Sequence, residues 1–522
     1  MNTKPKNNQV IYQVYPLTFA YAPGSAGDEY LGSYGNLKGI TAHAGYIASL
    51  GVDTVWITPF YPWGSTGFGY DITDYRGIDP MFGTKEDFAE LCRELHAHNL
   101  RVIIDQVYNH CSEEHEWFQL SLRRIKPYDE YFVWVDASEY DAKGNPLPPT
   151  NWPSIWNSDG PGVWTWNEQR KQFYLHSFDC SMPNLNIANP AVQDELLSIA
   201  KYWFDMGVDG FRLDAATHYG AGAVLRDNPL DKNGNQIRLY DINTEAGLTF
   251  LSRLKELCNS YPVPKTLLAE YWYDISKKGI ARSKKVVSRL KVDACFTGAL
   301  NGTLETFKQH IQNELKISPF GEKLNWAISN HDMERAGSRL FGKGYTPAKG
   351  ALLMRMLLTF PGSVCLFQGD ELGLPNPQSF AACKNRANDP LDVWTNFDTP
   401  WDASRAGFAM SDAADDITRN MALHPDEEQY KYAVSNQTGD KSVLAQTRQA
   451  IAIRKMGLFN EPGNILFLND IKDENVIAYV RTDKSGRRRV LCAFNFGNES
   501  VKITYKKHIL PVPAEDAVFV TL

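Results

Sequence analysis

An arginine and an aspartate at the end of an apolar run point to a reactive site near the middle of the chain. Residues 210–214 read Gly-Phe-Arg-Leu-Asp and follow an apolar helical pattern at 196–204. This order is typical of a helix followed by a buried strand with an acidic residue at its carboxyl end. Arg212 and Asp214 are two residues apart, so they face the same side of the strand and each offsets the cost of burying the other. A structural ion pair would give the same pattern.

Three other apolar runs end in side chains of the same kind: Asp105 followed by Asn109 and His110, then Glu270, and finally His331 and Asp332. Such carboxylates suit glycoside chemistry, in which one carboxylate attacks the anomeric carbon and a second, held protonated, donates to the leaving oxygen. Metal-assisted hydrolysis is the competing use, but His96 and His98 lie two apart on a predicted helix and cannot share a face. The chain has no Gly-x-Ser-x-Gly elbow and no glycine-rich phosphate loop after a predicted strand.

Strand and helix patterns alternate along most of the chain and indicate the elements that position these residues. Apolar runs predict eight strands, at 11–16, 54–59, 101–107, 210–215, 266–271, 294–298, 326–330 and 364–367. Helical patterns lie between or after them, at 38–50, 85–98, 190–206, 244–259, 302–315, 346–359 and 440–455. Eight β/α units favour a closed α/β fold, the (β/α)8 TIM barrel, whose active sites form at the carboxyl ends of the strands. The polar residues would then converge on one pocket.

Two segments depart from this alternation. Residues 111–185 are rich in Pro, Trp and Asn and lack helical periodicity, which predicts a subdomain (subdomain B) inserted after strand 3. Residues 457–522 consist of short apolar runs separated by Asp, Lys and Gly turns, which predicts a C-terminal antiparallel β-sandwich domain. The barrel would then comprise residues 1–110 and 186–456.

The composition fits a globular protein and excludes several classes of partner. The chain has 522 residues, 43% of them hydrophobic and 22% charged, enough for a large core. A net charge of −7 without basic clusters argues against a nucleic acid partner. No apolar stretch approaches the roughly 20 residues needed to cross a bilayer, so we expect a cytoplasmic protein with no membrane partner. The eight cysteines form no Cys-x-x-Cys pair and are expected to be buried free thiols. The sequence specifies no oligomeric state.

Four segments together resemble the signature segments of the α-amylase family of glycoside hydrolases. They read Asp-Gln-Val-Tyr-Asn-His, Gly-Phe-Arg-Leu-Asp, Leu-Leu-Ala-Glu and Ile-Ser-Asn-His-Asp, at 105–110, 210–214, 267–270 and 328–332. Their order and spacing match the family, and the similarity extends over nearly the whole chain. Residues 68–75 and 164–176 are more similar to the exo-acting α-glucosidase branch than to the endo-acting amylases.

The resemblance implies a role for each matching position. Asp214 would be the nucleophile that forms a β-glucosyl enzyme, and Glu270 would act first as acid and then as base, with retention of configuration. Asp332 would bind sugar hydroxyls more tightly in the transition state. The remaining implied substrate-binding residues are Arg212, which would keep Asp214 ionised and oriented, His110 and His331, which would donate to hydroxyls, and Tyr70, which would stack on the glucose ring.

Further positions bear on substrate choice. In α-glucosidases of this type an aspartate, here Asp71, binds the outer hydroxyls of the terminal glucose together with an arginine after strand 8. The candidate arginine is Arg386, although its surroundings depart from the family pattern, and a solvated surface charge is the other interpretation. Phe178 matches an aromatic residue that lines the pocket, or else belongs to the subdomain core. Ala215, after the nucleophile, favours α-1,4 over α-1,6 linkages by comparison with relatives.

Two loops add expectations. The long polar segment 220–241 would lie over the pocket as a lid. Many relatives carry a calcium-type loop after strand 1, but residues 23–30 of this chain lack its ligand spacing, so we predict no required metal ion and no cofactor.

The expected activity is therefore release of glucose from a small oligosaccharide or disaccharide α-glucoside substrate. An isomerase or glucosyltransferase, forming trehalose or acting on sucrose, would use the same three carboxylates, because a sugar hydroxyl can replace water. A non-catalytic transporter subunit is a second alternative, but such relatives need a membrane anchor and have lost catalytic carboxylates. The sequence keeps all three carboxylates.

Overall fold

The computed structural model describes residues 8–24, 32–64, 69–155, 162–272, 274, 279–296, 302–379, 383, 404–413, 417–506 and 508–522. Its centre is a closed barrel of eight parallel strands, in the order β1-β11-β10-β9-β8-β7-β3-β2. The strands are β1 (Val10–Val14), β2 (Thr54–Ile57), β3 (Arg101–Gln106), β7 (Gly210–Leu213), β8 (Thr266–Glu270), β9 (Ala294–Phe296), β10 (Leu324–Ala327) and β11 (Ser363–Phe367). The barrel prediction is therefore confirmed.

Register between neighbouring strands brings the polar residues to one end of the barrel. Asp105 on β3 lies opposite Arg212 on β7, and Glu270 is the last residue of β8. Every residue of β7 and β8 is buried. The barrel interior is filled by side chains from the strands, among them Trp56, Ile103 and Phe296. The polar side chains at the strand ends therefore lie next to an apolar layer.

Helices surround the barrel, and the six at predicted positions each begin at a side-chain N-cap. Helices at the predicted positions are α4 (Lys85–Ala97), α6 (Pro190–Asp205), α7 (Glu245–Ser260), α9 (Leu304–Ile317), α11 (Pro347–Leu357) and α13 (Val443–Arg454). The helix α4 begins with a capping box between Thr84 and Asp87. Asn189 accepts a hydrogen bond from Ala191 N at the start of α6.

Five helices differ from the sequence prediction or were missed by it. The helix predicted at 38–50 is interrupted at His43 and forms α2 (Leu37–Ala42) and α3 (Ala44–Ser49). His43 Nδ1 bonds to Gly39 O, which satisfies a carbonyl at the end of α2. The helix α8 (Ile280–Arg289) was not predicted; four of its ten residues are basic, and only Ser283 and Val287 are buried on it. The short helices α1 (Pro16–Phe19) and α10 (Ala336–Phe341) were also not predicted.

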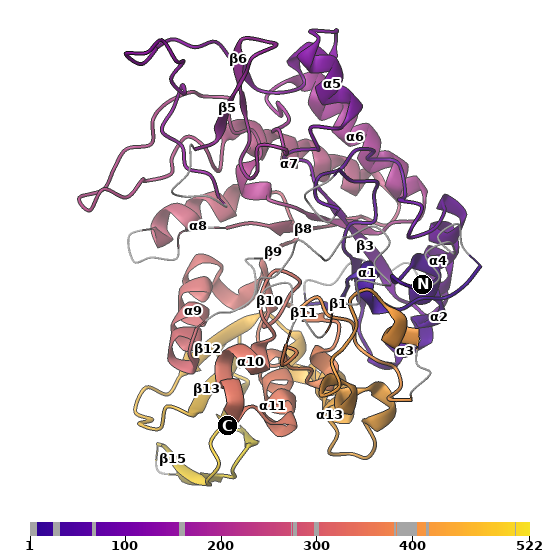
Figure 1. Cartoon of the computed structure of the whole chain (residues 1–522). Helices are drawn as coiled ribbons and strands as arrows, with labels where there is room; N and C mark the ends of the chain where they lie inside the picture. Colours follow the sequence, from indigo (N-terminus) through magenta and orange to yellow (C-terminus); the bar gives the residue numbers. More distant parts are fainter. Residues whose placement is uncertain are drawn as a thin grey trace.

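The segment between β3 and α6 forms the predicted inserted subdomain. It contains α5 (Glu116–Leu122) and a small antiparallel sheet of β4 (Trp134–Val135), β6 (Gln172–Leu175) and β5 (Trp164–Asn167). The subdomain has its own apolar cluster, including Trp152, Trp164 and Phe173. It lies at the top of Figure 1, at the end of the molecule opposite the C-terminal strands.

The C-terminal region is antiparallel, as predicted. One sheet contains β12 (Gly463–Phe467), β13 (Val476–Asp483), β14 (Arg489–Asn495) and β17 (Asp516–Thr521), and β15 (Val501–Tyr505) pairs with β16 (His508–Val512). Two buried arginines bind the same barrel turn, residues 358–360, one from the barrel helix α13 and one from the C-terminal sheet. Arg454 at the end of α13 donates to Leu358 O and Phe360 O, at 2.9 and 2.7 Å, and Arg481 on β13 donates to Thr359 O at 3.1 Å.

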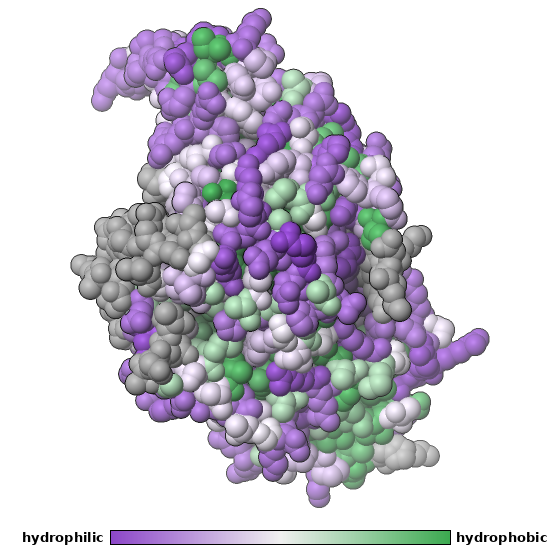
Figure 2. All heavy atoms as spheres, turned by 90° about the vertical axis from the view of Figure 1, so that its right-hand side faces the viewer, coloured by the Kyte–Doolittle hydropathy of each residue, from purple (hydrophilic) through white to green (hydrophobic). Residues whose placement is uncertain are grey.

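The surface and the thiols agree with a globular protein. Figure 2 shows a face covered mostly by hydrophilic residues, with hydrophobic residues in small separate groups. Among the residues that the structure describes, no helix combines the length and the apolar character that crossing a bilayer requires. All eight cysteines are free thiols, and all but Cys180 are buried.

Candidate active site

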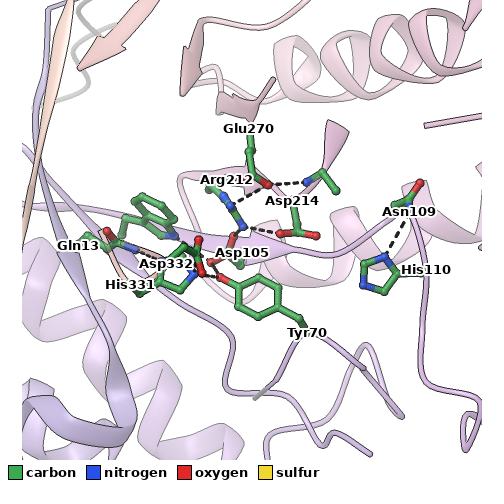
Figure 3. Close-up of polar contacts among 12 residues, drawn as sticks. Gln13, Tyr70, Asp105, Asn109, His110, Arg212, Asp214, Glu270, His331 and Asp332 are labelled. Carbon is green, nitrogen blue, oxygen red and sulfur yellow. Dashed lines mark hydrogen bonds and ion pairs between the residues drawn. The ribbon is translucent and has the colours of Figure 1, made fainter. Parts of the chain in front are cut away.

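Arg212 is the centre of a cluster of carboxyl groups at the carboxyl end of the barrel strands (Figure 3). Its Nη1 lies 2.7 Å from Asp105 Oδ1 and 2.7 Å from Asp214 Oδ1, and its Nη2 lies 2.9 Å from Glu270 Oε2. The Arg212 side chain is 1% exposed, so these ion pairs are screened little by solvent. Three consecutive strands, β3, β7 and β8, therefore deliver carboxyl groups to one guanidinium.

The backbone after the strand β7 fixes the relation between Asp214 and Glu270. Ala215 has a left-handed conformation, with φ of 45° and ψ of 33°, and leads into the 3-10 helix η3 (Ala216–His218). Its N–H donates to Glu270 Oε2 at 2.9 Å. A non-glycine residue in this region costs about 1 kcal/mol or more. The hydrogen bond to Glu270 offsets part of this cost, and the turn orients the Asp214 side chain toward Glu270. Ala215 also packs in an apolar cluster with Phe178 and Met182.

Tyr70 and His331 form a second part of the site, on the opposite side of Asp105. The Tyr70 hydroxyl lies 2.7 Å from His331 Nε2 and 3.2 Å from Asp105 Oδ2, and the two rings stack with centroids 5.6 Å apart. Gln13 Nε2 lies 2.7 Å from His331 Nδ1. Both ring nitrogens of His331 therefore have hydrogen-bond partners, which fixes the orientation of the imidazole ring.

Asp332 differs from the other three carboxyl groups because its side chain is 43% exposed. Asp105 is 0% exposed, and the Asp214 and Glu270 side chains are each 10% exposed. Asp332 Oδ2 lies 3.3 Å from His331 Nε2, and Oδ1 lies 3.3 Å from Arg405 Nη2. The Asp332 carboxyl group thus contacts the cluster through His331 and faces the open side of the barrel end.

The protonation states of these carboxyl groups differ with their surroundings. Burial raises the pKa of Asp214 and of Glu270 above the ordinary carboxyl range, against the opposing effect of Arg212. Burial also raises the pKa of Asp105 to about 6. Burial tends to raise the pKa of Asp332 as well, but His331, Arg405 and Arg212 act more strongly together and lower it. The site can therefore hold a proton on the Asp214–Glu270 pair while Asp332 stays ionised.

The histidines of the site are neutral at pH 7. Burial lowers the pKa of His331 to about 3 and that of His110 to about 4. At that pH the positive charge near Asp332 therefore comes from the guanidinium groups of Arg405 and Arg212. A neutral imidazole has one N–H and one acceptor nitrogen, so each ring can donate one hydrogen bond to a hydroxyl group.

The other predicted binding residues lie in the loops that follow β2 and β3 and in the inserted subdomain. His110 is buried, with its Nδ1 3.3 Å from Asn109 Nδ2 and its ring 5.1 Å from that of Phe178. Asp71 is fully buried. A β-carbon on Gly64 would lie only 2.8 Å from Asp71 Oδ2, so a larger residue at this position would displace the Asp71 side chain. Arg386 lies outside the described residues.

The segment 220–241, predicted as a lid, is joined to the inserted subdomain. Asn228 N donates to Asn151 Oδ1 at 2.8 Å, and Asn151 N donates to Asp227 Oδ1 at 2.8 Å. Arg238 Nη2 lies 3.4 Å from His218, whose ring is 5.8 Å from that of Phe178. These contacts connect the segment to the surroundings of Phe178, and its role as a lid stays a prediction.

Sequence reasoning missed three residues that contact the cluster. Gln13 lies within the strand β1, where nothing in the pattern separates it from other strand residues. Trp56 Nε1 lies 3.1 Å from Asp105 Oδ2, so this core residue also holds the buried carboxyl group. Arg405 follows a long segment without helical or strand periodicity. In the part of the chain that the structure describes, no group of three or more His, Cys, Asp or Glu residues is arranged to hold a metal ion.

Comparisons with known proteins agree with this architecture. The chain matches the family described as alpha amylase, catalytic domain, over residues 13–460, and the alpha amylase, C-terminal all-beta domain over residues 468–515. The chain thus belongs to the α-amylase family, and it is a glycoside hydrolase.

Individual relatives cover nearly the whole chain. A probable alpha-glucosidase of Rhizobium meliloti (strain 1021) is 33% identical, across 94% of this chain and 89% of the relative. The alpha-glucosidase of Apis mellifera is 29% identical, across 96% and 87%. Among solved structures, the alpha-glucosyl transfer enzyme XgtA aligns with a TM-score of 0.82 at 29% identity, across 99% of both chains.

Proposed function

We propose that this glycoside hydrolase is a retaining, exo-acting α-glucosidase that releases glucose from the non-reducing end of short α-glucosides, with maltose-like α-1,4 linkages preferred. The observation that carries the proposal is that Asp214 and Glu270 share one buried guanidinium, that of Arg212. This arrangement favours the short carboxyl separation of about 5–5.5 Å used by retaining enzymes over the roughly 6.5–9.5 Å that inverting enzymes need for a water molecule.

In the first step, the Asp214 carboxylate attacks the anomeric carbon and forms a covalent β-glucosyl ester. The bond from the anomeric carbon to the leaving oxygen breaks, and protonated Glu270 gives its proton to that oxygen. The raised pKa of the buried pair supports this division, since the pair can hold one proton near neutral pH, and the mechanism places that proton on Glu270 and leaves Asp214 ionised.

In the second step, the Glu270 carboxylate takes a proton from water, and the water oxygen attacks the anomeric carbon. The ester bond to Asp214 breaks, which releases glucose in the α configuration and restores both carboxyl groups. Asp332 and His331 would bind hydroxyl groups of the bound glucose, and His110 would donate from the other side of the pocket. Tyr70 would contact the sugar ring.

The exo preference and the linkage preference rest on fewer residues. A buried carboxyl group at Asp71, close to the pocket loops, supports a closed end that accepts a terminal glucose; its partner would be Arg386. The small side chain of Ala215, packed against Phe178 and Met182 directly after the nucleophile, supports the α-1,4 preference. The names of the curated relatives, alpha-glucosidase and probable alpha-glucosidase, support the same reaction.

Glucosyl transfer is the second candidate, and the similarity to the alpha-glucosyl transfer enzyme XgtA favours it. The covalent intermediate is the same, and a sugar hydroxyl takes the place of water in the second step. The outcome then depends on whether an acceptor sugar or water reaches the ester first, so transfer products are expected to increase with acceptor concentration.

A time course on maltose, isomaltose, sucrose and trehalose tests the proposal, with wild type and Asp214→Ala compared. Glucose released mainly from maltose, by the wild type alone and first as the α anomer in an NMR time course, would support an α-1,4-preferring retaining hydrolase. Maltotetraose should yield maltotriose and glucose as first products. Initial release of the β anomer, or of maltose from maltotetraose, would contradict retention or exo action. Trehalose or longer oligosaccharides as main products would instead support the transferase or isomerase.

A further inference from the structure

Arg405 is an arginine that reaches Asp332 from a segment unrelated to the signature motifs. Its Nη2 lies 3.3 Å from Asp332 Oδ1, and its Nε donates to His331 O at 2.7 Å. Its guanidinium carbon lies 5.7 Å from the centre of the Tyr15 ring, at the carboxyl end of β1, and its side chain is 13% exposed. One guanidinium thus contacts both the backbone and the carboxylate of the His331-Asp332 pair.

The position of Arg405 is set by the buried residues that follow it. Ala406 is 1% exposed and Phe408 is fully buried, with the Phe408 ring 5.2 Å from Phe19 and 6.4 Å from Tyr46. These contacts hold residues 406–408 against α1 and α3, close to the end of the strand β1. Arg405 is therefore attached to a packed segment, and its backbone is already ordered where the side chain binds Asp332.

The two arginines divide the carboxyl groups between them. Arg212 contacts Asp105, Asp214 and Glu270, whereas Arg405 contacts the half-exposed Asp332. With Glu270 protonated, three carboxylates and these two guanidinium groups leave one net negative charge among the described residues of the cluster. A single excess negative charge suits a transition state in which the sugar ring becomes cationic.

We propose that Arg405, the second arginine of the cluster, is a positioning residue. It orients Asp332 and keeps it ionised where it binds the sugar hydroxyls. This inference rests on the proposed function of the site. The contact with His331 O fixes the turn that carries Asp332, and the contact with Oδ1 directs Oδ2 toward His331 Nε2. Arg405 contacts protein groups and touches no reacting atom, so its effect on the reaction passes through Asp332.

Kinetics of Arg405→Gln and Arg405→Lys on maltose test the inference, with Arg419→Gln as the matched control. Arg419 belongs to the same part of the chain but pairs with Glu427 on the surface at 2.9 Å. We expect Arg405→Gln to lower kcat/KM about 10- to 100-fold, mostly through kcat, because Asp332 contributes most in the transition state. Arg405→Lys should recover part of this loss, and Arg419→Gln should leave the kinetics unchanged.

A pH profile separates a positioning role from a structural one. The groups that face Asp332 are His331, Arg405 and Arg212, together with Asp214, Glu270 and Tyr70. Loss of a positive neighbour favours protonation of Asp332, so the further fall of kcat/KM at low pH, below the limb set by Asp214, should move to higher pH in Arg405→Gln. Melting temperatures of all variants are measured alongside. If Arg405→Gln does not fold, Arg405→Lys carries the test, with a smaller change in the same direction.

The double variant Arg405→Gln with Asp332→Asn shows whether the two residues act together. If Arg405 acts through Asp332, its substitution should change kcat/KM by less than about twofold once Asp332 is neutral. Arg405 variants with wild-type kcat/KM and pH profile, or full additivity in the double variant, would overturn the inference. An inactive wild type would instead contradict the proposed function, so the two failures are distinguishable.

Discussion

The Asp105→Asn variant tests the electrostatic account of the site, because Asp105 is a fully buried carboxyl group that touches no substrate in the proposed mechanism. Asn has nearly the same shape but no charge. The Oδ1 atoms of Asp105 and Asp214 each lie 2.7 Å from the same nitrogen of Arg212, which places them about 5 Å apart or closer. At an effective dielectric constant of about 20, two negative charges at that distance repel by about 3 kcal/mol.

This repulsion raises the pKa of Asp214, and Asp105 and Glu270 repel each other in the same way across Arg212. Removing the charge of Asp105 favours the ionised form of both groups, so both pKa values should fall. In the proposed mechanism the acidic limb reports ionisation of Asp214 and the alkaline limb reports loss of the Glu270 proton, so both limbs should move to lower pH by about one to two units. At pH 7 the variant should lose general-acid catalysis.

The assay is the pH dependence of kcat/KM on maltose, compared with that on p-nitrophenyl α-glucoside. The nitrophenolate leaving group needs little protonation, so the loss at pH 7 should be much smaller for this substrate. Asp293→Asn is the matched control, because Asp293 is paired with Lys255 at 2.6 Å and precedes the strand β9, at the amino end of the barrel. A folded Asp105→Asn variant whose limbs stay in place, or move to higher pH, would refute the reasoning.

Three other perturbations have defined outcomes. Ala215→Val should lower the melting temperature, because a β-branched residue is strained at φ of 45°. It should also lower kcat/KM for maltose relative to isomaltose, because a larger side chain crowds Phe178. A product assay on both sugars checks the ratio of the two kcat/KM values, and an unchanged ratio would contradict the prediction. Chelation with EDTA should leave activity and melting temperature unchanged, and loss of either would show a required ion. His331→Asn should make unfolding less pH-dependent. The folded state keeps His331 neutral down to about pH 3 while the unfolded chain binds a proton near pH 6.5, so wild-type stability falls as the pH falls between these values. Denaturation at pH 7 and pH 4 gives the free energy of unfolding of both proteins at each pH. An equal change between the two pH values in wild type and variant would contradict the prediction.

The sequence contained enough information for the barrel and for the residues at its strand ends. Alternating helix and strand patterns predict the eight strands because buried strands and amphipathic helices have different periods. The same reasoning failed where tertiary contacts decide the structure. The break at His43 depends on a side-chain bond to Gly39 O, and α8 is a ten-residue helix in which four residues are basic.

Only those site residues that lie at recognisable strand ends could be predicted from the sequence. Arg212, Asp214 and Glu270 end β7 and β8, and their contacts follow from the register of parallel strands. Arg405 and Gln13 come from positions without such a pattern, and only folding brings them to His331. The division of four carboxyl groups between two arginines therefore had to come from the structure.

The arginines Arg454 and Arg481 have a consequence for how the molecule unfolds. They bond to the carbonyl groups of the turn between α11 and β11, and β11 is the strand that closes the barrel against β1. The turn before the closing strand is thus bound by the last barrel helix, α13, and by β13 of the C-terminal sheet. Barrel and C-terminal sheet should melt in a single cooperative transition, because Arg481 connects the C-terminal sheet to the turn that precedes the closing strand.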